Sequence, residues 1–378
     1  MLAKPWATVV ASRHIGVHVS RQRFAFIDWY RGLACVLMFQ THAYDAWTKE
    51  PDRQGFWWWM ARQQLGGFPA RMFLFLAGVS LMMRYASDAR RNVPTVTAKL
   101  GGVKRGFEVF AIGYAFRIGE WLLGGARPRA AWAILKVDVL QCIGLSLMLT
   151  ALVSSPKDLR PGRVPILPLL LALTVALGTP VLQHLGQPEL LPKWLSYYLW
   201  GGHPLVQFPV LPWVAQTLTG AFIGTFWMRA AAADKLDRTM LITGLVGTAL
   251  AVLGQVGEHV DIPIYRTHTP ALAHIATPVS YFYRSGMCMV FGALCFLYEK
   301  VRPIPKLSPL LLLGQASMLV YIVHVDLVYG IWSYPIKHRL NPWQASIGIL
   351  LLTIAMIWLS WYRIYRFKGF SFLKKNPS

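Results

Sequence analysis

The chain is short of charge, and what charge it has is mostly positive. Only 14% of its 378 residues are charged, against roughly 25% in ordinary soluble domains, whereas 55% are hydrophobic. Aspartate and glutamate together number 16, against 38 lysines and arginines. This composition excludes a soluble globular domain and a disordered polar chain. The long apolar runs that replace the missing charge predict an integral membrane protein.

Cysteine is also scarce: the chain has four, and all of them fall inside apolar stretches. None belongs to a Cys-x-x-Cys pair, the spacing typical of thiol redox motifs and of cysteine-bound zinc. We expect the four to pack as small apolar side chains. The histidines of one later connection match no zinc spacing, and we expect no metal; they are His259, His268 and His274.

The net charge of +22 would indicate nucleic-acid binding in a soluble protein. Here the basic residues lie in the connections between apolar stretches, as expected for loops that face the cytoplasm and anionic lipid. The sequence has no glycine-rich phosphate loop, which leaves ATP-driven transport without support. The first 25 residues lack the apolar core of a signal peptide, so we expect no cleavage there.

Apolar stretches of bilayer-crossing length recur along the whole chain, separated by prolines and glycines. We therefore predict an all-α fold, a polytopic membrane helical bundle of about ten transmembrane helices that form one membrane domain over residues 26–363. A cytoplasmic N-terminal segment (1–25) precedes this domain and a basic cytoplasmic tail (364–378) follows it. The predicted stretches are 26–45, 67–86, 104–123, 133–153, 165–184, 209–228, 239–256, 278–298, 309–333 and 343–362.

The distribution of lysine and arginine sets the predicted orientation. With both termini in the cytoplasm, the inner segments hold 24 of these residues and the outer segments hold 10. We therefore expect both termini to be cytoplasmic. In this orientation Arg31 lies near the cytoplasmic face of the first stretch, and His42 lies in its outer half.

Arg31 and His42 are two ionisable residues inside one apolar stretch, where charge is costly. Eleven residues of helix separate them by about 16 Å, so they would serve opposite sides of the membrane. Asp45 follows His42 by three residues and shares its helix face. Asp28 precedes Arg31 by three residues, so an ordinary helix ion pair competes with a functional role for Arg31.

Further polar residues within the stretches map to the outer half of the membrane in this orientation. Together they predict a polar cavity open to the outer side, and for each of them a structural ion pair or helix cap is the alternative. They are Arg71, Arg117, Glu120, Asp138, Gln141, Gln216, Arg284, His324 and Asp326.

Several segments, taken in order, carry a resemblance to a known family. The first contains an Arg followed eleven residues later by a His, with an Asp three residues before the Arg, and the second contains Phe-Leu-Ala-Gly. The pattern resembles the heparan-α-glucosaminide N-acetyltransferase catalytic-domain family, within the wider transmembrane acyltransferase superfamily, and it extends over about residues 23–330. The segments are 23–42, 68–80, 138–144 and 313–324, with a Pro-Trp span at 208–224.

The resemblance implies an integral-membrane acyltransferase that moves an acyl group, expected to be acetyl, from cytoplasmic acyl-CoA to a carbohydrate or envelope glycan on the outer side. The superfamily's Arg and His map onto Arg31 and His42. Heparan-type members carry their catalytic histidine in the loop after the first span, but residues 45–60 contain none. We therefore expect either that His42 takes that role here or that the chemistry differs, and the acceptor sugar and the acyl group stay open.

The chemistry of acyl transfer gives each residue an expected role. His42 acts as general base or acyl carrier, and Asp45 orients its imidazole. Arg31 belongs to the catalytic set and, with Arg71, binds the phosphates of acetyl-CoA or stabilises charge on the thioester oxygen. The expected acceptor-binding residues are Asp138, Gln141, Arg284, His324 and Asp326.

Two other classes compete with the enzyme. A proton-coupled transporter of a small polar solute would be favoured by an inverted repeat with two broken spans, and the sequence offers none. A structural accessory component would use the polar residues as contacts between helices. We expect a multi-pass protein of the bacterial inner or plasma membrane that binds acyl-CoA, a carbohydrate acceptor and membrane lipid but no nucleic acid, with a homodimer as one option.

Overall fold

The computed structural model describes residues 24–185, 191–201, 203, 205–257 and 277–366. Within these ranges the chain is helical, and β-type pairing is confined to two isolated bridges. The all-α prediction is therefore confirmed for the described part of the chain. The N-terminal residues 1–23, the tail beyond 366, and His259, His268 and His274 lie outside the described residues.

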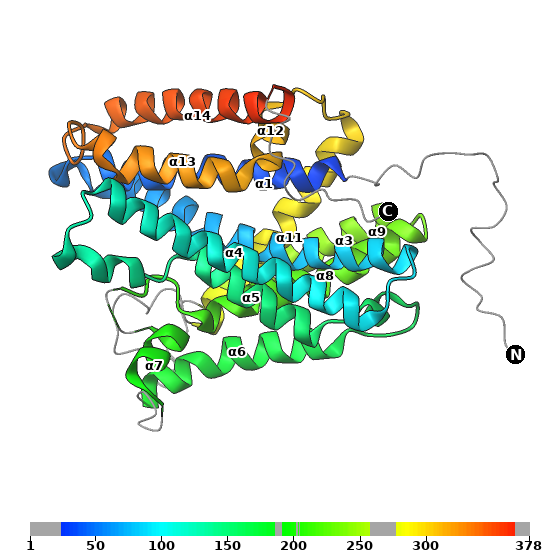
Figure 1. The fold of residues 1–378 in the computed structure, drawn as a ribbon. Helices are drawn as coiled ribbons and strands as arrows, with labels where there is room; N and C mark the ends of the chain where they lie inside the picture. Colours follow the sequence, from blue (N-terminus) through cyan, green and yellow to red (C-terminus); the bar gives the residue numbers. More distant parts are fainter. Residues whose placement is uncertain (1–23, 186–190, 202, 204, 258–276, 367–378) are drawn as a thin grey trace, which may run out of the picture.

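A helix, or in one case a bent pair of helices, lies over every predicted stretch (Figure 1). The predicted boundaries differ from the helix ends by several residues, most clearly at α4, which begins earlier than expected. The long helices are α1 (Ala25–Trp47), α3 (Pro69–Arg90), α4 (Thr95–Leu123), α5 (Val139–Val153), α6 (Ile166–Leu185), α8 (Val210–Ala232), α9 (Leu236–Gly257), α11 (Pro278–Val301), α12 (Pro309–Gln315) with α13 (Ser317–Tyr329), and α14 (Pro342–Tyr365). Two short helices, α2 (Gly55–Trp58) and α7 (Lys193–Trp200), lie in the connections.

Several of these helices can cross a membrane by length and composition. Five helical stretches meet that test in the described chain, and the bent pair α12–α13 makes a sixth if it counts as one span. α5 is apolar but has only 15 residues. The chain is thus a multi-pass membrane protein, while ten crossings and cytoplasmic termini stay predictions. The five stretches are Gly55–Arg90, Ile166–Gln183, Leu236–Gly257, Pro278–Val301 and Pro342–Tyr365.

The predicted stretch 309–333 is not one straight helix. Its axis turns by 93° between α12 and α13. α12 crosses α1 in backbone contact, because a Cβ added at Gly314 would lie 1.8 Å from the carbonyl oxygen of Asp28, and one added at Gly32 would lie 1.9 Å from that of Leu310. After the break α13 runs beside α1 (Figure 1). The apolar run continues through the break, which is why the sequence pattern predicted one helix.

Helix contacts bring a set of polar residues to one end of the bundle. α3 and α8 run parallel, because Phe75 faces Gly220 and Val79 faces Gly224. α1 and α11 run antiparallel, because the backbone N–H of Phe26 donates to the Glu299 carboxylate, whereas the hydroxyl of the later Tyr30 donates to the carbonyl of the earlier Cys288. We call the end that holds the last turns of α1 and α13 and the first turns of α3, α5 and α8 the histidine end.

Candidate active site

His42 of α1 and His324 of α13 are distant in the sequence and bonded to each other in the fold. Nδ1 of His42 lies 3.0 Å from Nε2 of His324, and the rings stack with centroids 5.2 Å apart and planes 10° apart. His324 is fully buried, whereas His42 is half-buried. The fold therefore joins the residue predicted to be catalytic to one predicted to bind the acceptor.

Val320 fixes the direction of the hydrogen bonds in this pair. Its carbonyl oxygen lies 3.0 Å from Nδ1 of His324, and a carbonyl can only accept, so that nitrogen carries a proton. In a neutral His324 the Nε2 atom is then the acceptor, and Nδ1 of His42 is the donor. A neutral His42 therefore has its lone pair on Nε2, the nitrogen that faces away from His324.

Asp45 lies beside the pair, but the Nδ1 atom of His42 bonds to His324 instead of to Asp45. One carboxylate oxygen of Asp45 accepts from Nε of Arg62 at 3.1 Å, and the other accepts from the Tyr329 hydroxyl at 3.1 Å. The Tyr329 ring meets the His42 ring edge to face, with centroids 5.5 Å apart. We expected Asp45 to orient the His42 imidazole; the direct hydrogen bond to that ring is made by His324, and Asp45 reaches the imidazole through Tyr329.

Asp138 and Gln141 begin α5 and connect it to the histidine pair. They form a capping box, in which the Gln141 side chain accepts from the backbone N–H of Asp138 at 3.1 Å. Asp138 also pairs with Arg117 of α4, and it accepts from the Tyr321 hydroxyl at 3.4 Å. The Tyr321 ring lies 5.6 Å from the His324 ring, centroid to centroid. Asp138 is thus both a helix cap and a neighbour of the site.

Arg71 and Arg284 bind the turn that precedes α3. Nη1 of Arg71 donates to the carbonyl of Gly67 at 2.8 Å, and its guanidinium lies over the Trp213 ring at 4.8 Å. Nη1 of Arg284 donates to the carbonyl of Gln64, also at 2.8 Å. Both arginines therefore lie at the histidine end, while their predicted position in the outer half of the membrane stays a prediction.

Two predicted site residues lie apart from this cluster. Arg31 is near the opposite end of α1, where it pairs with Asp28 at 2.7 Å and donates to the Ser80 hydroxyl at 3.0 Å. Asp326 follows His324 by two residues on α13, and residues at that spacing face different sides of a helix. The fold therefore does not bring Asp326 to the histidine pair.

Sequence reasoning missed the two tyrosines and one arginine that complete the cluster. Tyr321 precedes His324 by three residues, so a shared helix face was a usable signal. Tyr329 and Arg62 gave none, because Tyr329 ends α13 and Arg62 belongs to the irregular helical turns between α2 and α3. Their role depends on contacts between segments distant in the sequence.

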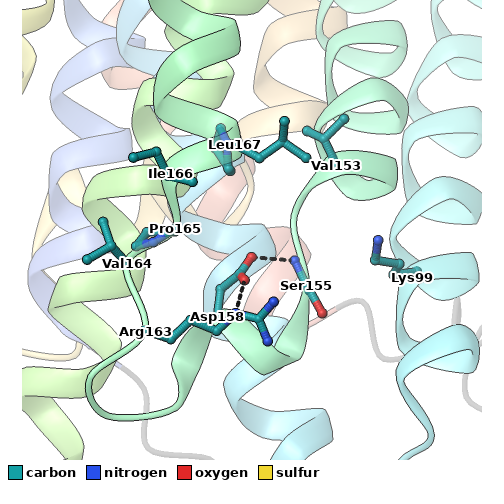
Figure 2. Close-up of a pocket in the computed structure, with 10 residues that line it drawn as sticks. Lys99, Val153, Ser155, Asp158, Arg163, Val164, Pro165, Ile166 and Leu167 are labelled. Atoms are coloured by element: carbon teal, nitrogen blue, oxygen red, sulfur yellow. Dashed lines mark hydrogen bonds and ion pairs between the residues drawn. The ribbon is translucent and has the colours of Figure 1, made fainter.

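One cavity of about 300 Å³ lies at the other end of the bundle, between the start of α4, the end of α5 and the start of α6. Figure 2 shows Asp158 in its loop, bonded to the backbone N–H of Ser155 and facing Arg163, with Lys99 across from them on α4. A second cavity of about 300 Å³ lies between α9 and α11 and is mainly apolar. None of the predicted site residues lines either cavity.

Metal ligands do not gather in the described part of the chain: no three His, Cys, Asp or Glu side chains there could hold an ion together. The side chains around His42 instead supply hydrogen-bond donors, acceptors and charge.

Comparison with known proteins supplies the family. The model of the heparan-alpha-glucosaminide N-acetyltransferase catalytic domain matches residues 23–270, about two thirds of the chain. The match includes Arg31, His42, Arg71 and Asp138, and it ends before α11, so the expected likeness up to residue 330 is confirmed only to residue 270. None of the curated proteins compared with the chain matches it. By its matched residues, the chain belongs to the heparan-alpha-glucosaminide N-acetyltransferase catalytic-domain family.

Proposed function

We propose that this membrane acetyltransferase moves the acetyl group of cytoplasmic acetyl-CoA to a carbohydrate or envelope glycan on the outer side, with His42 as the base. The observation that carries the proposal is the bond from His42 to the buried His324. It leaves the lone pair of the half-buried His42 on Nε2, the ring nitrogen that is not bonded to His324. Family membership supplies the reaction class.

The proposed step is a direct transfer. Nε2 of His42 removes a proton from the acceptor amine or hydroxyl, which attacks the thioester carbonyl carbon. A new N–C or O–C bond forms as the C–S bond breaks, and the leaving thiolate takes the proton from the imidazolium to give CoA. Transient transfer of the acetyl group to His42 itself is the other path that this nitrogen allows.

The donor would approach from the Arg31 end. Arg31 is 22% exposed and holds a salt bridge with Asp28, so its guanidinium retains donors for a phosphate. About 16 Å of helix separates it from His42, so the thioester has to extend along α1 to reach the base. The proposed orientation, with ten crossings and both termini in the cytoplasm, places the histidine end on the outer side.

One observation favours the transporter as a second candidate. The 93° break between α12 and α13 resembles the discontinuous helices that bind solutes in transporters. Inverted-repeat transporters have two such breaks in corresponding positions, and in the described part of this chain one bent pair meets the membrane-span test. The enzyme is therefore the better-supported function.

The test is to incubate the purified protein with acetyl-CoA and candidate amino sugars or glycans. Release of free CoA thiol, together with an acetyl mass gain on the acceptor, supports the proposal. Counterflow of labelled solute in liposomes, without consumption of acetyl-CoA, would favour the transporter and overturn it.

A further inference from the structure

Arg71 is a buried cation that lacks a carboxylate partner among the described residues. It is 7% exposed, and its contacts there are the Gly67 carbonyl and the face of the Trp213 ring. The charged or titratable groups that interact with it are the Arg284 guanidinium and the Cys288 thiol, and neither supplies a full negative charge. A carbonyl and a ring face compensate only part of a buried charge. The guanidinium therefore retains N–H donors for an anion.

Two further buried donors lie on the helix that Arg71 contacts. Trp213 is 6% exposed and Gln216 is 4% exposed. Among the described residues, the indole Nε1 of Trp213 and the amide Nε2 of Gln216 have no oxygen or nitrogen acceptor, although the Gln216 side chain also contacts the Cys288 thiol. The two residues are three apart on α8 and share a face. The amide oxygen of Gln216 is already occupied, because the Ser285 hydroxyl donates to it at 3.0 Å. Donors without acceptors thus gather where α3 meets α8.

The surroundings add positive potential. Arg284 lies against Gly67, since a Cβ added there would be 2.5 Å from its Nη1, so two guanidinium groups flank one turn. α3 begins at Pro69 and α8 at Val210, and because the helices are parallel their positive ends lie at the same end of the bundle. Each of these features stabilises a negative charge.

We propose that Arg71, Trp213 and Gln216 bind one oxyanion group, a carboxylate, phosphate or sulfate, of the acceptor. The site lies at the histidine end, and Gly66 of the same turn packs on Thr41, the neighbour of His42. Arg71 was expected to bind the phosphates of acetyl-CoA together with Arg31, but the two arginines lie toward opposite ends of the bundle. The proposed function places those phosphates at the Arg31 end, so we assign the Arg71 site to the acceptor. This assignment rests on the proposed function, because it gives that reaction an anionic acceptor.

Anion binding can be measured without turnover. The thermal midpoint of the purified full chain in detergent is followed as sulfate, phosphate or acetate replaces chloride at constant ionic strength. We expect a saturable rise with at least one of these oxyanions, since a ligand that binds the folded state stabilises it. Arg71→Gln should lose the rise. Arg105→Gln, which removes an exposed arginine paired with Glu108 on α4, is the matched control and should keep it.

Trp213→Phe is a second variant, which tests the same site if Arg71→Gln does not fold. It retains the ring under Arg71 and removes the indole N–H, so the half-saturating concentration should rise roughly tenfold, as expected for one lost charge-assisted hydrogen bond. No saturable rise in the wild type, or an unchanged rise in Arg71→Gln, would overturn the site. Competition between CoA and the oxyanion, with weaker CoA binding in Arg71→Gln, would assign the site to the donor and overturn it equally.

A second arm links the site to the acceptor. Acetyl transfer to glucosamine is compared with transfer to glucosamine 6-sulfate. We expect KM to be roughly tenfold lower for the sulfated sugar, and we expect Arg71→Gln to remove this difference between the two KM values. Equal KM values for the two sugars in the wild type would contradict an anionic acceptor. His42→Ala should keep the oxyanion-dependent rise in thermal midpoint, so failure of the proposed function and failure of this site give different results.

Discussion

At the scale of single residues, His324 fills the position that a carboxylate fills in a Ser-His-Asp triad. It accepts from Nδ1 of His42 and thereby selects the tautomer whose Nε2 can act as base. Its own Nδ1 is held by the neutral Val320 carbonyl, which stabilises an imidazolium less than a carboxylate would. The carboxylates of Asp138 and Asp45 also interact electrostatically with His42, although each is itself paired with an arginine. We therefore regard His324 as a positioning residue.

His324→Ala should lower kcat for acetyl transfer by about 10²–10⁴-fold, the range typical of a base that loses its correct tautomer. His324→Gln provides an amide oxygen as acceptor and should retain more activity. KM for acetyl-CoA should change less than kcat, because the contact orients the base and does not bind the donor. Steady-state kinetics of both variants checks this, and an undiminished kcat in His324→Ala would contradict the positioning role.

Sequence reasoning reached individual site residues but not their partners. An ionisable group is costly in a bilayer, and this argument led to His42, Arg71, Asp138 and His324, which the fold brings to one end of the bundle. The sequence could not pair His42 with His324, because helix spacing relates neighbours within one helix and gives no information on contacts between helices. The same limit explains why Asp45, on the same helix as His42, was preferred as its partner.

At the scale of helices, the crossing of α1 and α12 is the contact least tolerant of change. Gly32→Ala or Gly314→Ala would place a methyl group within 2 Å of a backbone carbonyl, and backbone cannot rotate away as a side chain can. We expect a loss of about 3 kcal/mol or more in the free energy of unfolding, together with lower activity, because α13 carries His324 directly after the break.

Gly178→Ala in α6 is the matched control for this prediction. A Cβ at Gly178 meets nothing within 4 Å, so the helix-favouring effect of alanine should leave stability unchanged or raise it by about 0.5–1 kcal/mol. Thermal unfolding in detergent measures all three variants. Equal midpoints for Gly314→Ala and Gly178→Ala would show that the crossing tolerates a methyl group.

The helix positions could be predicted well from the sequence, because a long apolar run between prolines and glycines satisfies its backbone hydrogen bonds in a bilayer by forming a helix. The local geometry inside these runs could not be predicted. The α12–α13 break depends on backbone contact with α1, and the irregular turns that hold Arg62 depend on packing against α1, including the bond from the Gln40 amide to the Ala61 carbonyl at 2.9 Å. Neither contact has a signature in residue spacing.

At the scale of the whole molecule, orientation decides which end meets the donor. Excess lysine and arginine in alternate connections predicts that the loop at 124–127, which lies at the histidine end, is outside and that the C-terminus is cytoplasmic. Alkaline phosphatase, which is active only outside the bacterial cytoplasm, should therefore be active when inserted in that loop and inactive when fused after residue 378. The reverse pattern would place the histidine end on the donor side.

The most direct test of the account is acetyl transfer by His42→Ala. The purified variant and the wild type are incubated with acetyl-CoA and an acceptor that the wild type modifies, and both thiol release and acceptor mass are followed. We predict that His42→Ala folds and inserts normally, binds acetyl-CoA, and loses at least about 10²-fold in transfer rate, since a base contributes 10²–10⁴-fold. A folded His42→Ala protein that transfers acetyl groups at the wild-type rate would contradict the central claim.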